Sequence, residues 1–196
     1  MIYEMRFIKE IPRPGSDLIK NLERYSTPDI CDAVGVFDSM DDGIKPWVTQ
    51  NRIVGPAITI KVPIGEGGII PRAIEVAQEG DIIVIAGKGN TLSAYWGDQR
   101  SKMALARGVA GVIVDGAFRD CDDCEKIGLP VYAKGLTTGS SGKTGAGEVN
   151  VPISCGGIVV NPGDIIVADR NGICCIPWEH ADELVACLEA KFGLDC

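Results

Sequence analysis

Three ionisable residues in the middle of the chain have the types and the spacing expected of a metal-assisted reaction site. Asp98 stands just inside a predicted helix, and the pair Arg119-Asp120 directly follows a predicted buried strand. The residues between them suffice for one helix and one strand, which would return the chain to the same edge of a parallel sheet. Two carboxylates beside one fixed cation suit a hard metal ion and an anionic substrate. The sequence therefore predicts that Asp98, Arg119 and Asp120 converge.

The elements that must position these residues alternate between strand and helix. Unbroken apolar runs at 53–62, 81–86 and 111–115 are typical of strands buried on both faces, and helical patterns lie between them at 69–79 and 98–107. This order favours parallel strands joined by crossover helices. After Pro130 the chain becomes β-rich, with predicted strands at 130–133, 149–153, 157–160, 164–168 and 173–176.

Helices are predicted near both ends. Residues 15–25 form one, and a second opens with Thr27 as N-cap and Pro28 at the first helical position. A last helix covers about 178–192. No linker or low-complexity segment divides the chain, so we expect one α/β domain over 1–196. Its parts are an N-terminal extension and helix (1–25), a mostly parallel sheet with flanking helices, a β-rich C-terminal half, and a C-terminal helix (178–196).

Composition limits the partners. The formal net charge is -8, which argues against a nucleic-acid partner held through its phosphates. No segment reaches the roughly 18 apolar residues of a membrane span, and the N-terminus lacks a signal-peptide pattern. We therefore expect a cytoplasmic protein without a membrane partner. Cys155, Cys174, Cys175 and Cys187 lie in apolar or periodic stretches, where a thiol acts as a small core residue, and a disulfide scaffold is not expected.

Two glycine-rich stretches resemble nucleotide-binding motifs but break the pattern. Gly87-Lys88-Gly89 lacks the third glycine of a dinucleotide fingerprint, because Leu92 stands there, and a plain turn is favoured. The segment 139–144 ends like a phosphate-binding P-loop, but a strand-like run follows it in place of a helix. A loop that presents Lys143 to an anion remains an open alternative.

The cysteine pair and the histidine favour simpler roles. Cys121 and Cys124 could form half of a zinc site, but the chain has no second such pair and a single histidine, His180. The neighbouring acids should raise the pKa of both thiols. His180 is expected on the surface, and nucleophilic chemistry based on a Ser-His or Cys-His pair has little support.

The spacing D-x20-R-D-x2-D, formed by Asp98, Arg119, Asp120 and Asp123, resembles a known signature. It is similar to that of the class II pyruvate aldolases that act on 4-hydroxy-4-methyl-2-oxoglutarate and 4-carboxy-4-hydroxy-2-oxoadipate. The same family includes the RraA-like proteins, named for a regulator of ribonuclease E activity. Supporting stretches are STPDICDAVG (26–35), VGPAITIKV, LARGVAGVIVDGAFRD, LPVYAKG and VNPGDIIVADRNGICCIP. The resemblance covers about residues 20–180.

The resemblance implies roles for individual residues. Asp120 would bind Mg²⁺ or Mn²⁺ directly, while Asp98 and Asp123 would hold it through water. Gly97, Gln99 and Arg100 would bind the substrate, with the backbone N–H groups of Gln99 and Arg100 meeting its carboxylate. Arg119 would lie against the keto oxygen and stabilise a pyruvate enolate. A water positioned by Asp98 would protonate that enolate.

The resemblance also implies an activity and an assembly. The substrate would be a 2-keto acid, cleaved by a retro-aldol step to pyruvate, with oxaloacetate decarboxylation through the same enolate. The fold would resemble the swivelling phosphohistidine domain. The chain would form a homotrimer or hexamer, in which 26–35 helps to form the neighbour's site wall. A further acid would come from a neighbouring subunit, and Glu179, Glu183 and Glu189 are the candidates.

A regulator that acts by protein contact, without catalysis, is the alternative. An acidic surface could mimic nucleic acid or dock on a basic segment of a partner. Asp98 separates the two hypotheses, because the resemblance implies that regulators often carry glycine at this position. The aspartate favours catalysis. A trimer with a vestigial site, in which Arg119 and Asp120 are only an ion pair, is the remaining hypothesis.

Overall fold

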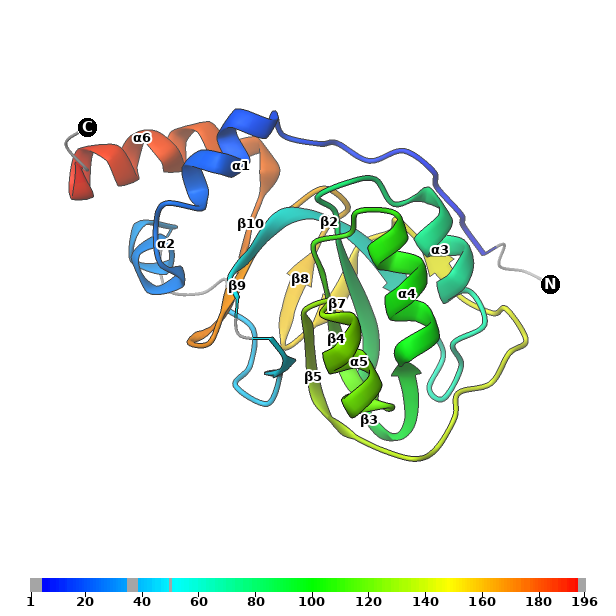
Figure 1. Ribbon diagram of the computed structural model, residues 1–196. Helices are drawn as coiled ribbons and strands as arrows, with labels where there is room; N and C mark the ends of the chain where they lie inside the picture. Colours follow the sequence, from blue (N-terminus) through cyan, green and yellow to red (C-terminus); the bar gives the residue numbers. More distant parts are fainter. Residues whose placement is uncertain (1–4, 35–38, 50, 194–196) are drawn as a thin grey trace.

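The computed structural model describes residues 5–34, 39–49 and 51–193. Gly35, the last residue of the 26–35 motif, and the outermost residues of both predicted terminal segments lie outside these ranges. The centre of the fold is one mixed sheet with strand order β1-β5-β4-β3-β2-β9-β10, and β6 pairs with β2 beside this path. A separate two-stranded sheet is formed by β7 and β8. Figure 1 shows α3, α4 and α5 against one side of the main sheet. Helices α1, α2 and α6 lie near the end of the sheet that is formed by β9 and β10.

The helices are α1 (Ser16–Leu22), α2 (Thr27–Val34), α3 (Ile70–Val76), α4 (Asp98–Ala106), α5 (Cys121–Ile127) and α6 (Ala181–Phe192), with a short 3-10 turn at Trp178–His180. The strands are β1 (Lys45–Val48), β2 (Ile53–Lys61), β3 (Ile82–Trp96), β4 (Gly111–Phe118), β5 (Val131–Leu136), β6 (Glu148–Val149), β7 (Ile153–Cys155), β8 (Ile158–Val160), β9 (Ile165–Asp169) and β10 (Gly172–Ile176).

The predicted parallel centre is confirmed. Strands β2, β3, β4 and β5 pair in parallel, with Ile58 opposite Ile83, Ile83 opposite Val112 and Ile113 opposite Tyr132. Every residue of β4 is buried, and β2 is buried except at its last residue. Burial on both faces explains why these strands are unbroken runs of Val and Ile. The outer pairs β1–β5, β2–β9 and β9–β10 are antiparallel, as a β-rich second half allows.

Three element predictions need correction. The strand predicted at 81–86 continues to Trp96, and the Gly87-Lys88-Gly89 turn is an irregularity within it, with φ of 57° at Lys88 and 69° at Gly89. The predicted strand 149–153 is divided, because β6 ends at Val149 and β7 begins at Ile153. Helix α5 was not predicted, since its sequence CDDCEKI carries too few apolar residues to show a helical period.

The N-cap of α2 is Ser26, and the prediction of Thr27 was wrong. The Ser26 hydroxyl accepts a hydrogen bond from the Asp29 backbone N–H at 3.2 Å, and the Asp29 carboxylate accepts bonds from the Ser26 N–H and hydroxyl. This reciprocal pair is a capping box. Thr27 is the first helical residue, and its backbone N–H donates to Asp169 on β9. The Thr27 bond therefore ties the start of α2 to the sheet.

Separate apolar clusters hold the helices to the sheet. One lies between β2, β3, β4 and helices α3, α4 and α5, and includes Trp96, Phe118 and Cys124. Another joins α1, α2 and α6 to β9 and β10 through Leu22, Ile30 and other residues. None of the helices in the described part of the chain has both the length and the apolar character that a bilayer crossing requires.

Candidate functional site

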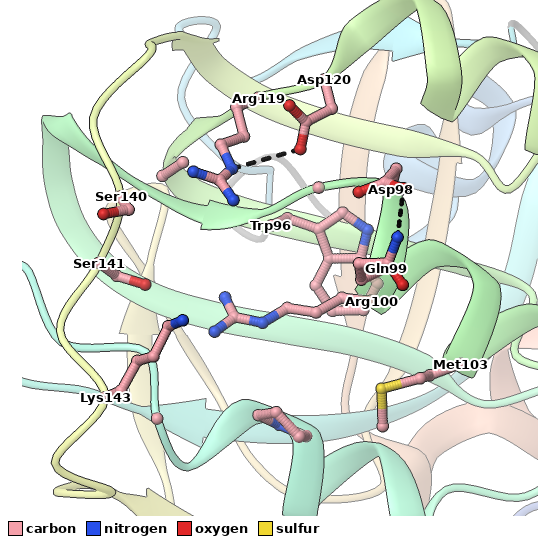
Figure 2. Close-up of a pocket in the computed structure, with 14 residues that line it drawn as sticks. Trp96, Asp98, Gln99, Arg100, Met103, Arg119, Asp120, Ser140, Ser141 and Lys143 are labelled. Atoms are coloured by element: carbon pink, nitrogen blue, oxygen red, sulfur yellow. Dashed lines mark hydrogen bonds and ion pairs between the residues drawn. The ribbon is translucent and has the colours of Figure 1, made fainter.

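A cavity of about 360 Å³ lies where β3 and β4 end. Trp96 and Phe118 are the last residues of these parallel strands and are register partners, and the Arg119 N–H donates to the Trp96 carbonyl at 3.2 Å. Residues that follow the two strands must therefore meet. The cavity is lined by Gly68, Pro71, Ala94, Trp96, Gly97, Asp98, Gln99, Arg100, Met103, Arg119, Asp120, Ser140, Ser141 and Lys143 (Figure 2).

Asp98 is the first residue of α4, and it lines the cavity with an ionised carboxylate. Its carboxylate accepts a hydrogen bond from Lys102 Nζ at 2.8 Å and another from Gln99 Nε2 at 2.7 Å. The Lys102 bond is the largest cause that lowers the pKa of Asp98, and the Gln99 donors assist it against desolvation. A negative charge at this position also suits the positive end of the helix dipole.

Asp120 is held in an uncommon backbone conformation. Its φ of 59° and ψ of 42° lie in the left-handed region, although it is not a glycine. Such conformations cost free energy and are retained where the surroundings over-determine them, as they are at functional sites. Its carboxylate contacts Arg119 Nε at 3.2 Å (Figure 2). The turn between β4 and α5 therefore presents the acid and the guanidinium together.

Gly97 and Cys124 contact this turn in different ways. Gly97 leaves room for Asp120, because a Cβ at Gly97 would lie 2.9 Å from Asp120 Oδ2. The Cys124 thiol donates to the Arg119 carbonyl at 3.6 Å and accepts a bond from the Ser101 hydroxyl, which in turn accepts from Trp96 Nε1. This buried chain of contacts connects β3, α4 and α5 beneath the cavity.

Arg100 contributes a partly buried guanidinium. It donates to the carbonyl of Tyr95 and, at 2.7 Å, to the carbonyl of Gly67. Burial lowers the pKa of Arg100 to about 10, with a contribution from the charge of Arg119, so that it stays protonated at neutral pH. Two guanidinium groups thus share a cavity in a protein of net charge -8. Such a site attracts small anions.

The structure brings most of the predicted site residues together. Asp98, Arg119, Asp120, Gly97, Gln99 and Arg100 all line the cavity. Asp123 does not line it, and its carboxylate pairs with Lys126 Nζ at 2.8 Å on α5. The water-mediated role of Asp123 therefore stays a prediction.

The donors suit a hard divalent cation that keeps several water ligands. Within residues 5–34, 39–49 and 51–193, no cluster of three or more His, Cys, Asp or Glu side chains is arranged to hold a metal ion. Asp120 and Asp98 line one cavity, however, and both offer oxygen ligands. Mg²⁺ accepts a site with one or two carboxylates when water and substrate oxygens complete its coordination.

One wall of the cavity contains Lys143, which the sequence indicated only as an alternative anion-binding residue. Ser140, Ser141 and Lys143 line it, on the segment between β5 and β6. No helix follows this segment, so it is not a P-loop, but it does bring Lys143 to the site. The Gly-Ser-Ser-Gly-Lys sequence was the available signal.

The remaining sequence motifs are the Cys121-Cys124 pair and His180, for which the structure gives the burial and the neighbouring charges. Burial raises the pKa of the Cys121 thiol, and the charges of Glu125 and Asp122 raise it further. Burial likewise raises the pKa of Cys124. All cysteines in the described part of the chain are free thiols. His180 is exposed and contacts Glu183 at 3.3 Å.

A model of one protein family, RraA-like (Aldolase/RraA), matches residues 27–175. The chain belongs to this family. A relative in Halalkalibacterium halodurans, named a putative 4-hydroxy-4-methyl-2-oxoglutarate aldolase, is 40% identical over 161 residues, which is 82% of this chain and 77% of that protein. The family resemblance seen in the sequence is thereby confirmed.

Solved structures of similar proteins share the fold. RraAS2 of Streptomyces coelicolor, described as an unusual member of the RNase ES inhibitor RraA protein family, superposes with a TM-score of 0.83 at 26% identity, over 92% of this chain and 96% of that chain. RraA of Thermus thermophilis, described as an RNA-processing inhibitor, has a TM-score of 0.73 at 27% identity, over 78% and 93% of the two chains. The RraA-like family thus contains both named aldolases and named inhibitors.

Proposed function

We propose that this RraA-like protein is a divalent-metal-dependent lyase that cleaves the C–C bond beside a 2-keto acid, as in 4-hydroxy-4-methyl-2-oxoglutarate. The observation that carries the proposal is that Asp98, Arg119 and Asp120 line one cavity, with Asp120 in a left-handed conformation. Oxaloacetate decarboxylation would proceed at the same site.

Asp98, Arg119 and Asp120 would each have a separate role in the proposed reaction. Asp120 would hold Mg²⁺ or Mn²⁺ directly and Asp98 through water, and the bound metal would supply Lewis-acid stabilisation of enolate charge. The Arg119 guanidinium donates hydrogen bonds to the keto oxygen as negative charge develops there. Cleavage breaks the C3–C4 bond, the C4 hydroxyl gives its proton to solvent water, and C3 gains one from a water that Asp98 would orient. Pyruvate and a second carbonyl compound leave.

The acid expected from a neighbouring subunit fits this arrangement. Glu179, Glu183 and Glu189 lie on the 3-10 turn and α6, and none of them lines the cavity. Figure 1 shows α6 at the far end of the molecule from α4. Any contribution from these acids would therefore come from another copy, in the proposed homotrimer or hexamer. Light scattering should give a mass three or six times the 20.8 kDa of one chain.

The test is pyruvate release from 4-hydroxy-4-methyl-2-oxoglutarate and from oxaloacetate. We expect turnover with Mg²⁺ or Mn²⁺, its loss after EDTA treatment, and competitive inhibition by oxalate, a planar mimic of the enolate. Asp122→Ala, which removes an exposed carboxylate of α5 outside the cavity, serves as the matched control for Asp120→Ala. Turnover that survives exhaustive chelation would contradict the proposal.

A contact-acting regulator of an RNase is the second candidate, favoured by the inhibitors among the similar structures. It predicts binding to an RNase E-type enzyme that Asp120→Ala leaves intact. The lyase predicts that the same variant loses turnover.

A further inference from the structure

A second cavity, of about 160 Å³, lies beside α2 and the turn between β9 and β10, and none of the residues that line it lines the candidate site. Cys31 of α2 and Ser39 form part of its wall, together with Arg170 and Asn171 of that turn. The Cys31 side chain is only partly buried. Since a water molecule takes about 30 Å³ in the liquid, this cavity admits only small molecules.

The adjacent cysteines of β10 face opposite sides of the sheet. Cys174 belongs to the apolar cluster that joins α1, α2 and α6 to β9 and β10. Cys175 belongs to a different cluster, with Ile166 and Ala168 of β9. Successive side chains of a strand alternate in this way. Both thiols are buried, but Cys174 faces α2 and Cys175 faces away from it.

The Cys174 thiol meets Cys31 across the packing of α2 on β10. Cys31 lies one turn into α2 and packs against the cluster that contains Cys174, and the two side chains form a hydrogen bond. Ser39 completes the group, because its hydroxyl lies 3.3 Å from Cys31 Sγ and its backbone forms an antiparallel bridge with Cys174. The next residue, Met40, donates its N–H to the Ile173 carbonyl at 2.9 Å. Two thiols and one hydroxyl thus converge from three segments of the chain.

These contacts favour the thiolate form of Cys31. The hydrogen bond from Cys174 is the largest cause that lowers the pKa of Cys31 to about 6, and the Ser39 hydroxyl lowers it further. Burial and the negative charges of Asp32 and Asp169 oppose this shift. Cys31 is therefore mostly ionised at neutral pH. The thiolate is the form of cysteine that reacts with oxidants.

We propose that Cys31 is an oxidation site for small neutral peroxides, and that Cys174 is the thiol that converts the oxidised Cys31 to a disulfide. The cavity gives a molecule the size of hydrogen peroxide access to Cys31, and the buried Cys174 lies behind it. The disulfide joins α2 to β10, and a thiol reductant opens it again. This oxidation is independent of the proposed lyase activity.

The reaction takes two steps and transfers two electrons. The Cys31 thiolate attacks one oxygen of hydrogen peroxide, the O–O bond breaks, and hydroxide leaves and is protonated by solvent. Cys31 then carries a sulfenic acid. The Cys174 sulfur attacks the Cys31 sulfur, the S–O bond breaks, and water leaves with the proton of the Cys174 thiol. Two thiols are thereby oxidised to one disulfide, and the peroxide is reduced to water.

The first test is peptide mass mapping after the reduced protein has been treated with hydrogen peroxide. We expect a peptide pair joined through Cys31 and Cys174, lighter by two hydrogen atoms, that dithiothreitol separates. Cys175→Ala is the matched control and should leave this bond unchanged, because the Cys175 thiol neighbours Cys174 in sequence but faces the other side of the sheet. A Cys31 that stays reduced, or that pairs with another cysteine, would overturn the proposal.

Single variants distinguish the roles of the two thiols. In Cys174→Ala the sulfenic acid of Cys31 meets no second thiol, so dimedone, which reacts with sulfenic acids, should label Cys31. In Cys31→Ser the buried Cys174 should stay reduced. Ser39→Ala removes an exposed hydroxyl and keeps both cysteines, and it should slow the peroxide reaction roughly 2- to 5-fold by removing a hydrogen bond to the thiolate. A dimedone label on Cys174 in Cys31→Ser would overturn the assignment of Cys31 as the attacking thiol.

A comparison of two oxidants tests the role of the cavity, with the exposed Cys187 of α6 as an internal reference. Hydrogen peroxide should oxidise Cys31 before Cys187. Oxidised glutathione is too large for the cavity and should modify Cys187 before Cys31. Preferential modification of Cys31 by oxidised glutathione would overturn the assignment of a small oxidant.

Thermal unfolding tests whether the disulfide holds α2 to the sheet. The bond between Cys31 and Cys174 closes a long loop and so constrains the unfolded chain. The oxidised protein should unfold roughly 5 °C or more above the reduced protein, and dithiothreitol should remove the difference. A mapped Cys31–Cys174 bond without such a rise would overturn the proposed joining of α2 to β10.

Discussion

Asp120 and Arg119 are adjacent in the sequence but have different tasks, so their variants should fail differently. Asp120→Ala removes the proposed direct metal ligand, and both metal affinity and turnover should be lost. Arg119→Lys keeps the charge but not the planar fork of donors, so metal affinity should persist while kcat falls roughly 100-fold or more. Calorimetric metal titration beside steady-state kinetics measures both effects. Equal, small losses in the two variants would mean that the pair is only a loop ion pair.

Asp98 offers a test of electrostatics at the same scale. Because the Lys102 hydrogen bond is the largest cause of its lowered pKa, Lys102→Ala should raise the pKa of Asp98 toward the ordinary value of 3.8. The ion pair stabilises the fold above that value, and this contribution is lost as the pH falls through the lower, folded-state pKa. In the variant, protonation should begin at higher pH. An NMR titration of the Asp98 carboxyl carbon measures the shift, and Lys126→Ala should not produce it.

At the scale of elements, the junction of β3 and α4 positions the site. Gly97 has an extended backbone with φ of 175°, which any residue adopts, so its small size is what matters. Gly97→Ala should place a methyl group 2.9 Å from Asp120 Oδ2 and displace that carboxylate. Metal affinity should fall roughly 10- to 100-fold, with little change in the thermal midpoint. Gly15→Ala, where nothing lies within 4 Å, is the control.

At the scale of the whole molecule, the N-terminal segment 5–15 crosses the fold and is tied down at a buried carboxylate (Figure 1). Asp81 is fully buried and accepts bonds from Arg13 Nε at 3.0 Å and Nη2 at 2.9 Å, and from the Gln78 N–H at 2.8 Å. Arg13→Ala would leave this charge poorly paired and should lower the free energy of unfolding by about 3 kcal/mol.

Urea denaturation measures this effect, and Arg24→Ala, which removes an exposed arginine in the turn after α1, should change stability by less than about 0.5 kcal/mol. The double variant Arg13→Ala with Asp81→Asn should regain part of the loss, because the unpaired charge is gone. An unchanged unfolding midpoint in Arg13→Ala would show that the segment is not anchored there.

The sequence by itself determined the parallel centre of the fold and the convergence of Asp98, Arg119 and Asp120. Both follow from local rules: apolar runs identify buried strands, and residues after neighbouring parallel strands meet at one edge. The same spacing carried the family resemblance. The prediction of Thr27 as N-cap failed because Ser26 and Thr27 both suit a cap, and only Asp29 and Asp169 decide between them in three dimensions.

Only the tertiary structure decided which distant residues complete the site. The sequence left the presentation of Lys143 to an anion as an alternative, but its loop has no hydrophobic period that would place it in one cavity with Arg100. The Thr144 and Gly145 N–H groups of its loop donate to the Glu66 carboxylate, and the loop packs closely on Gly67 and Gly68, which are far from it in sequence. The left-handed conformation of Asp120 is likewise visible only in the folded chain, where the Cys124 N–H donates to the Asp120 carbonyl and the Cys124 thiol to the Arg119 carbonyl. Periodicity reports which residues are buried in an element, but the pairing of loops depends on contacts that only the folded chain creates.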